Sequence, residues 1–305
     1  MKKSFSARLK KDLQRHKFKY LIFLPVLIYL ILFCYKPMYG IIIAFQKFRP
    51  SLGIERSPWV GFEQFTRAFQ DPFFWRALRN TFSISLLTLV FSFPAPVFLA
   101  LLLNEVKVSW FKRSVQTLTY MPHFIASVVV CGMITTYCQT NGLISQIMVF
   151  FGGQPTNLLT HSKYFYPIYI LSGVWQNVGW NSIIYLAALA GIDQEQYEAA
   201  KIDGASRIQQ MIYITFPGLI PTMSMLLVLN LGRVLNVGYE KILLLYQPLT
   251  YEVADVISTY VYRKGLIDAD YSFSTAVNLF NSAVNIVFLL TSNRISKKLG
   301  QSGLF

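Results

Sequence analysis

The chain has 305 residues, of which 54% are hydrophobic and only 14% are charged. A soluble domain carries about a quarter of its residues as charged side chains, so this composition excludes an ordinary soluble protein and indicates an integral membrane protein. The formal net charge is +14. Because the basic residues gather at the ends of apolar segments, we interpret them as charges that flank a membrane, and we expect no nucleic-acid partner.

The chain begins with a basic segment, 1–19, that holds eight Lys and Arg residues and one Asp. The apolar run behind it is too long for a signal peptide, and no small-residue cleavage site follows it. We therefore expect a cytoplasmic segment that lies against anionic lipid. The first span is predicted over 20–42. Residues 46–79 are polar with many aromatic side chains, which favours amphipathic helices at the outer face.

Further apolar segments are long enough to cross a bilayer. They are 80–103, 115–137, 165–190, 218–237 and 272–292. Pro94 and Pro96 predict a kink in the second span. We expect a single six-span domain over 20–292, outer loops at 139–164 and 238–271, and a cytoplasmic tail at 293–305. With the N-terminus inside, the inner segments hold 16 of the 28 Lys and Arg residues, which supports this orientation.

A polar hairpin, 193–217, separates the fourth and fifth spans. Asp193 and Gln196 have the spacing of a capping box, and Ser206 and Gln209 repeat it. Gly204 supplies the left-handed position that ends a helix. We predict two short helices that meet at Gly204. On these local signals alone, the hairpin is either an ordinary helical loop or a docking element for a partner in water.

Amide and aromatic side chains recur in the last three predicted spans. Those singled out are Trp175, Asn177, Trp180, Asn181, Asn230, Asn236, Asn278 and Asn281. Amides both donate and accept hydrogen bonds, and aromatic faces stack on the C–H faces of sugar rings, so the set suits a polyhydroxylated solute. The alternative is that these amides only join helices. Arg233 either faces an acidic sugar or extends to the membrane surface.

The chain carries no sequence pattern for phosphate binding, metal binding or catalysis. Because it lacks a GxxxxGK[ST] loop, an ATP-driven pump would need its ATPase on another chain. The cysteines, Cys34, Cys131 and Cys138, have no metal-binding spacing, and we interpret them as small buried apolar residues. We therefore predict no catalytic residue, no metal site and no cofactor bound by this chain.

The hairpin carries a spaced pattern: Glu198-Ala199-Ala200, three residues, Gly204, nine residues, then Ile214-Thr215-Phe216-Pro217. The pattern resembles the EAA loop of ABC importer permeases, with Phe216 where leucine is usual. The resemblance implies that the first hairpin helix docks on a cytoplasmic ATPase subunit. The residues to which it assigns this coupling are Glu198, Ala199, Ala200, Asp203, Gly204, Ile214 and Pro217.

The likeness extends over nearly the whole chain. The run IDGASRIQQMIYITFPGLIP is similar to the carbohydrate branch of these permeases, which includes the maltose importer subunits, and TYEVADVISTYVYRKGL is similar to its polysaccharide-transport members. The resemblance implies an all-α type I ABC importer permease with six transmembrane helices in a bacterial cytoplasmic membrane, with both termini cytoplasmic. It also implies that Asn177, Trp180 and Asn230 contact sugar.

The same resemblance implies several partners. They are a second and different permease subunit, two ATPase subunits that hold ATP and Mg²⁺, an extracytoplasmic solute-binding protein and the lipid bilayer. The expected function is the channel subunit of an ATP-driven oligosaccharide importer that works by alternating access and is not itself an enzyme.

Two alternatives come from other functional classes. A secondary transporter would use carboxylates inside the spans, and such residues are essentially absent. A membrane-embedded transferase would need the acidic residues of the last outer loop, whose spacing matches no known motif. They are Glu240, Glu252, Asp255, Asp268 and Asp270.

Overall fold

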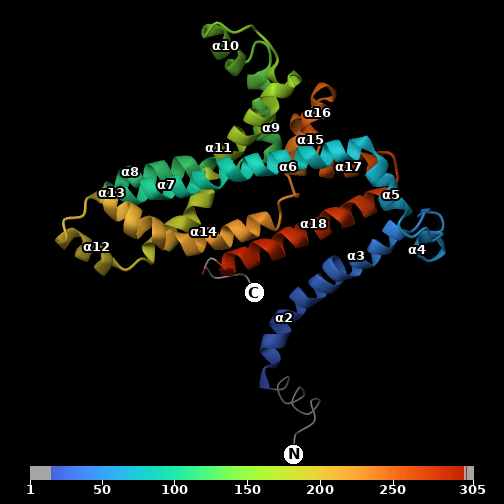
Figure 1. The fold of residues 1–305 in the computed structure, drawn as a ribbon, viewed down its shortest axis with the longest axis horizontal. Coiled ribbons are helices and arrows are strands. Elements are labelled where there is room, and N and C mark those ends of the chain that lie inside the picture. Colours follow the sequence, from blue (N-terminus) through green and yellow to red (C-terminus); the bar gives the residue numbers. More distant parts are fainter. Residues whose placement is uncertain (1–14, 299, 301–305) are drawn as a thin grey trace, which may run out of the picture.

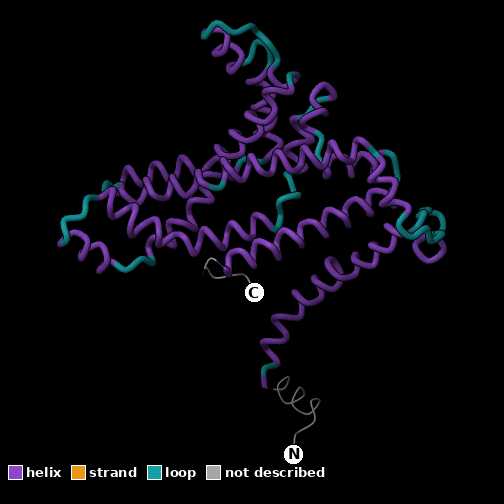
Figure 2. Tube along the Cα trace, viewed as in Figure 1, coloured by secondary structure: helices purple, strands orange, loops and turns teal. Residues whose placement is uncertain are grey.

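The computed structural model describes residues 15–298 and 300, and this part of the chain is helical, without a β-sheet (Figures 1 and 2). Residues 1–14 of the predicted basic segment, and residues 299 and 301–305 of the predicted tail, lie outside the described residues. Within the described range, the prediction of an all-α protein is confirmed.

The centre of the bundle is α11 (Ser162–Ala190). It packs against α6 (Pro72–Ser92), α7 (Pro94–Glu105), α8 (Ser109–Tyr120) and α14 (Phe216–Leu231). Helix α18 (Tyr271–Lys298) packs on α14. In Figure 1, α6 and α7 run along the long axis above α14 and α18. One buried cluster joins Val97 and Ala100 of α7 to Tyr185 and Leu189 of α11 and Leu219 of α14.

Among the described residues, four helices are long and apolar enough to cross a membrane: Lys17–Phe45, Pro72–Glu105, Arg207–Leu231 and Tyr271–Lys298. The second of these joins α6 and α7 at Phe93, directly before Pro94, where the sequence predicted a kink. Helix α11 has 29 residues, which is enough length, but its amides and tryptophans make it less apolar. A bent helix pair is a further candidate, so the count of six spans stays a prediction.

The third predicted span, 115–137, is wrong as a continuous helix. Helix α8 passes into a 3-10 turn, η3 (Met121–Phe124), and α9 (Ser127–Cys138) starts after a break, with a bend of 97° between the two parts. Pro122 lies in this turn and has no N–H to donate, which explains why regular helix ends here. Helix α9 and the following α10 (Leu143–Phe150) form an arm, with α10 at its far end (Figure 1).

The first span extends away from the bundle (Figure 1). It comprises α2 (Lys17–Tyr29), a π-helical stretch (Leu30–Tyr35), α3 (Lys36–Met38) and a 3-10 stretch, η2 (Tyr39–Phe45), and its most apolar part is wholly unburied in this chain. Of these parts, η2 packs on α18. Cys34 is exposed on this helix, so the expectation that all three cysteines are buried is wrong for Cys34.

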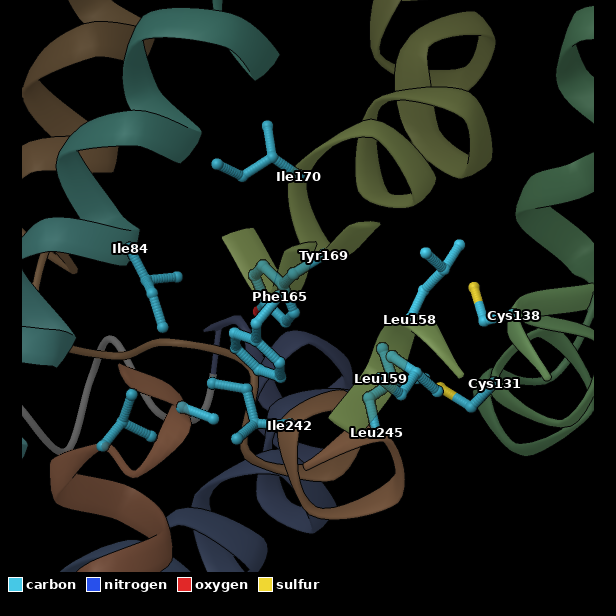
Figure 3. Packing of buried hydrophobic residues seen from close by; sticks show 12 residues of the cluster. Ile84, Cys131, Cys138, Leu158, Leu159, Phe165, Tyr169, Ile170, Ile242 and Leu245 are labelled. Atoms are coloured by element: carbon cyan, nitrogen blue, oxygen red, sulfur yellow. The ribbon is translucent and has the colours of Figure 1, made fainter. Parts of the chain in front are cut away.

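Cys131 and Cys138 are buried, as predicted, in the largest apolar cluster. Figure 3 shows Cys138 beside Leu158 and Cys131 beside Leu159, and both leucines belong to a short turn, Leu158–Thr160. The cluster continues through Phe165 and Tyr169 of α11 to Ile242 of α15 (Tyr239–Leu245). It therefore anchors the arm that carries α9 and α10 to the central helix.

The predicted outer loops contain short helices. These are α4 (Gly53–Arg56), α5 (Glu63–Gln70), α16 (Tyr251–Ala254) and α17 (Ile257–Tyr262), followed by a π-helical turn, Arg263–Ile267. The fully buried Asp255 holds the last of them, because its two oxygens accept from both terminal nitrogens of Arg263. Asn80 of α6 donates to the backbone oxygen of Asp255 at 3.0 Å, which ties this region to the bundle.

Candidate functional site

The hairpin begins with α12 (Gln194–Ile202), whose start is capped by the Asp193 side chain accepting from the Glu195 N–H at 3.0 Å. The capping box predicted with Gln196 is not formed. Gly204 has φ +75°, and the Ala205 N–H donates to the Ala200 oxygen at 2.8 Å. This is the left-handed helix ending that the glycine predicted.

The second hairpin helix, α13 (Arg207–Gln210), has the predicted capping box of Ser206 and Gln209. It is not a separate short helix, however. It continues through a π-helical turn, Met211–Thr215, into α14, so that Arg207–Leu231 is one span. The continuation is possible because the wider π-helical turn keeps the backbone hydrogen-bonded up to Pro217. Pro217 lies in the first turn of α14 and has no N–H, so it leaves no donor without a partner there.

The hairpin helices α12 and α13 lie at one end of the molecule (Figure 1). Glu198, Ala199, Asp203, Gly204 and Pro217 are exposed, and Ala200 and Ile214 are half-buried. The apolar side chain of Ile202 is 87% exposed. An apolar and acidic surface of this kind on a short helix suits a protein partner, and the coupling role of these residues stays a prediction.

Tyr197 is a residue of the hairpin that sequence reasoning missed. Its hydroxyl lies 3.0 Å from the hydroxyl of the buried Thr215, and no other side-chain hydrogen bond joins α12 to the span in the described residues. Gly218 adds a close approach, because a Cβ there would meet the Ile192 side chain at 2.5 Å. One face of the hairpin is therefore attached to the span that contains α14, and its other face is exposed.

A cavity of about 670 Å³ lies between α6, α11, α14 and the segment that follows α14. Five of the predicted solute-path residues line it: Asn177, Trp180, Asn181, Asn230 and Asn236. The other three, Trp175, Asn278 and Asn281, do not line it. Three hydroxyl side chains of α6 also line the cavity and were not predicted, although their helical spacing places them on one face. They are Ser85, Thr88 and Ser92.

The amides in the cavity differ in how they are held. The Asn177 Nδ2 donates to the Gly173 oxygen at 3.1 Å, and its Oδ1 lies 3.0 Å from Nδ1 of His123. The Asn230 Nδ2 donates to the Leu226 oxygen at 2.8 Å. The side chain of Asn181 makes no hydrogen bond within the described residues, so its donors and acceptor are free for a solute.

Two asparagines of α18, Asn281 and Asn285, instead join this helix to the segment after α14, which is the alternative that the sequence left open. The Asn285 Nδ2 and the Asn281 Nδ2 both donate to the Asn236 Oδ1, at 3.2 and 3.3 Å. The Asn285 Oδ1 accepts from the Leu235 N–H at 3.1 Å. Asn278 is exposed and contributes only its backbone oxygen to a bond with Ser282. These bonds fix the turn after α14, from which Arg233 and Asn236 reach the cavity.

Two cationic side chains line the cavity, and no Asp or Glu is among the described residues that line it. Arg233 has no ion-pair partner within the described chain. The Lys241 Nζ donates to the Tyr169 oxygen at 3.1 Å and lies 5.0 Å from the centre of the Tyr169 ring. Lys241 belongs to α15, outside the candidate spans, and burial lowers the pKa of its ammonium group to about 8.

The sequence pattern of a known protein family covers most of this architecture. A family described as "Binding-protein-dependent transport system inner membrane component" matches residues 92–301. The chain belongs to this family. The matched region includes the hairpin, α11, α14 and α18, so the permease is a multi-pass membrane protein of a binding-protein-dependent transport system.

The permease is similar to transport system permease proteins over nearly all of its length. It is 44% identical over 305 residues to the polygalacturonan/rhamnogalacturonan transport system permease protein YteP of Bacillus subtilis (strain 168), an alignment that covers 100% of this chain and 95% of the relative. It is 27% identical over 280 residues to the arabinooligosaccharides transport system permease protein AraP of the same organism, covering 91% and 86%.

A solved structure shares the fold. The crystal structure of a bacterial ABC transporter involved in the import of the acidic polysaccharide alginate contains a chain 43% identical to the permease. The two superpose with a TM-score of 0.90 over 96% of this chain and 100% of that one. This confirms the predicted fold of a type I ABC importer permease.

Proposed function

We propose that the permease is the channel subunit of an ATP-driven, binding-protein-dependent importer of oligosaccharides, and that its solute is acidic. The observation that carries the proposal is the cavity on α11. It combines amides, a tryptophan, two cations and no carboxylate among the described lining residues. Its volume of about 670 Å³ lies within the range of about 300–1,000 Å³ that small-molecule sites occupy.

The chemistry of the lining suits sugars of this kind. Asn181 and Asn230 offer donors and acceptors for hydroxyl groups, and Trp180 offers a flat apolar surface for the C–H face of a ring. Arg233 presents a guanidinium group without an ion-pair partner among the described residues, and this group can bind a carboxylate through two parallel hydrogen bonds. The relatives that transport polygalacturonan/rhamnogalacturonan and alginate support an acidic solute.

The energy for transport comes from other chains in this proposal. The open face of α12, with Glu198 and Ala199, docks on one of two ATPase subunits, which hold ATP and Mg²⁺. Rigid motion of the hairpin reaches the bundle because α13 and α14 are one helix. A second, different permease subunit completes the path, and a solute-binding protein delivers the sugar. A homologous transporter has been crystallised with an alginate pentasaccharide-bound periplasmic protein. In this arrangement the permease lies in a bacterial cytoplasmic membrane, with the hairpin and both termini inside.

The acidic-solute half of the proposal is tested by a comparison of charge at constant sugar length. The complete transporter in proteoliposomes is given oligogalacturonates of one length, either free or fully methyl-esterified. We expect uptake of the free acid to exceed that of the ester, and Arg233→Gln to lower uptake of the acid alone by roughly 10-fold or more, as expected for a charged hydrogen bond worth about 1.5–3 kcal/mol. Equal uptake of acid and ester, unchanged by Arg233→Gln, would contradict it.

A further inference from the structure

The break in the third span lies against the cavity-lining face of α11. The break is the segment 124–127, which runs from the last residue of η3 to the first residue of α9, and the chain bends by 97° there. The Gln176 Nε2 donates to the Ile125 oxygen at 3.1 Å, within the break itself. Gln176 also lines the cavity. One helix face therefore both surrounds the solute cavity and holds the bend.

His123 makes the closest part of this contact. Its ring is stacked on the indole of Trp180, with centroids 4.7 Å apart and planes 4° from parallel. Its Nδ1 lies 3.0 Å from the Asn177 Oδ1. Because the Asn177 Nδ2 already donates to the Gly173 oxygen, Oδ1 is the acceptor and His123 donates from Nδ1. His123 thus holds two cavity residues at once, and it does not itself line the cavity.

The other face of the Trp180 indole has no ring partner among the described residues. Phe124 is nearly perpendicular to both stacked rings and lies 5.6 Å from His123 and 5.3 Å from Trp180. A ring on the far face of Trp180 would be much farther from His123 than from Trp180. Phe124 therefore lies beside the stack, and the second indole face is left for the cavity.

We propose that His123 is a positioning residue for solute recognition, which fixes Trp180 and Asn177 for the sugar and ties their position to the bend at 124–127. This inference rests on the proposed function. A sugar ring that stacks on the open indole face and binds Asn177 presses on the same two side chains that hold His123. Occupancy of the cavity and the geometry of the bend are then linked through one imidazole ring.

The test is a double-mutant cycle on uptake by the complete transporter in proteoliposomes, with an oligogalacturonate of one length as the probe. His123→Ala in the otherwise unchanged permease is expected to lower the uptake per ATP hydrolysed roughly 2- to 10-fold, the size of one aromatic pair interaction. In a Trp180→Ala permease the same change is expected to cost less than it does in the unchanged permease, because the stacking contribution is gone and only the bond to Asn177 remains. His161→Ala, a histidine that hydrogen-bonds Thr156 away from the cavity, serves as the matched control and should have little effect.

A second variant guards against a folding defect. His123→Phe keeps a flat ring on Trp180, so it should retain more uptake per ATP than His123→Asn, which cannot stack. An equal effect of His123→Ala with and without Trp180, or an unchanged uptake in His123→Ala, would overturn the inference. Failure of the unmodified transporter to take up the probe would instead contradict the proposed function.

Discussion

The hydroxyl groups of Tyr197 and Thr215 lie 3.0 Å apart and join helix α12 to the end of the π-helical turn before α14. Thr215 is 1% exposed, so this bond is shielded from water at the base of the hairpin. A net contribution of about 0.5–1.5 kcal/mol is expected for such a bond. It links the surface assigned to the ATPase with the span that lines the cavity.

Removing this bond should loosen the link without removing the docking surface. We expect Tyr197→Phe to lower solute uptake per ATP hydrolysed roughly 2- to 10-fold, from the loss of one shielded hydrogen bond. The ATPase subunits should still co-purify with the permease. The measurement is uptake and hydrolysis in the same proteoliposomes, with Tyr213→Phe, an exposed tyrosine, as the control. Unchanged uptake per ATP would show that the bond carries no coupling.

The docking surface itself is tested by substitutions on the open face of α12. Ala199→Trp, which adds bulk at an exposed position, and Glu198→Ala, which removes an acidic group, should each reduce co-purification of the ATPase subunits or abolish coupling. The spans should stay folded, because neither side chain is buried in this chain. Gln196→Ala, at another exposed α12 position, is the control. Normal uptake together with full ATPase recovery in both variants would refute the coupling role.

The lowered pKa of Lys241 predicts a pH dependence of transport. Since burial lowers this pKa to about 8, the ammonium group loses its proton near pH 8 rather than near the ordinary value of about 10.4. Uptake of an acidic oligosaccharide should therefore fall as the pH rises from 7 to 9.5. Lys241→Met should remove the part of the fall that comes from this group. A fall of the same size in Lys241→Met would contradict the assignment.

The lowered pKa of Lys241 also affects folding stability, and here a rise in pH is favourable, whereas it lowers transport. The unfolded chain binds the Lys241 proton more tightly than the folded chain does, so this group lowers stability at neutral pH. Its unfavourable contribution should lessen between pH 8 and about 10.4, as the folded state and then the unfolded state become neutral. The melting temperature of Lys241→Met should therefore exceed that of the unmodified permease at pH 7 by more than it does at pH 10.

Gly179 permits the tight contact between α8 and α11. A Cβ at this position would lie 2.1 Å from the backbone oxygen of Thr119, which is a closer approach than any side chain tolerates. Gly179→Ala should destabilise the permease by about 1–3 kcal/mol or displace α8. Thermal unfolding in detergent measures this, with Gly132→Ala as the matched control, because a Cβ at Gly132 meets nothing within 4 Å. Equal melting temperatures for the two variants would contradict the packing.

Local signals predicted the turn at Gly204 and the capping box of Ser206 and Gln209, but they did not predict the continuity of α13 with α14 or the long-range contacts. Gly204 and the capping residues act on backbone groups a few positions away, so their effect can be read from spacing. The bend after Pro122 was missed, because a proline inside an apolar run was read as part of a continuous span. The stack of His123 on Trp180 joins residues 57 positions apart, and no periodicity encodes such a pair.

The predicted solute-path residues show the same difference between local signals and long-range contacts. The amides of α11 and α14 were recognised by residue type, and those that line the cavity do so because their helices pack around it. Asn281 and Asn285 of α18 have the same residue type and helical spacing, yet they bond Asn236 across the helix interface. Residue type predicts which side chains can bind a sugar. Only the packing shows which of them face the cavity.

The central claim is that this chain is a channel subunit whose transport is driven by separate ATPase subunits, and one measurement tests it most directly. The complete transporter, with its binding protein and an oligogalacturonate of one length, is reconstituted in vesicles with or without ATP. The account predicts uptake that requires ATP and disappears when the ATPase subunits are removed. Uptake of the same oligosaccharide by the permease alone, driven by an ion gradient and indifferent to ATP, would contradict it.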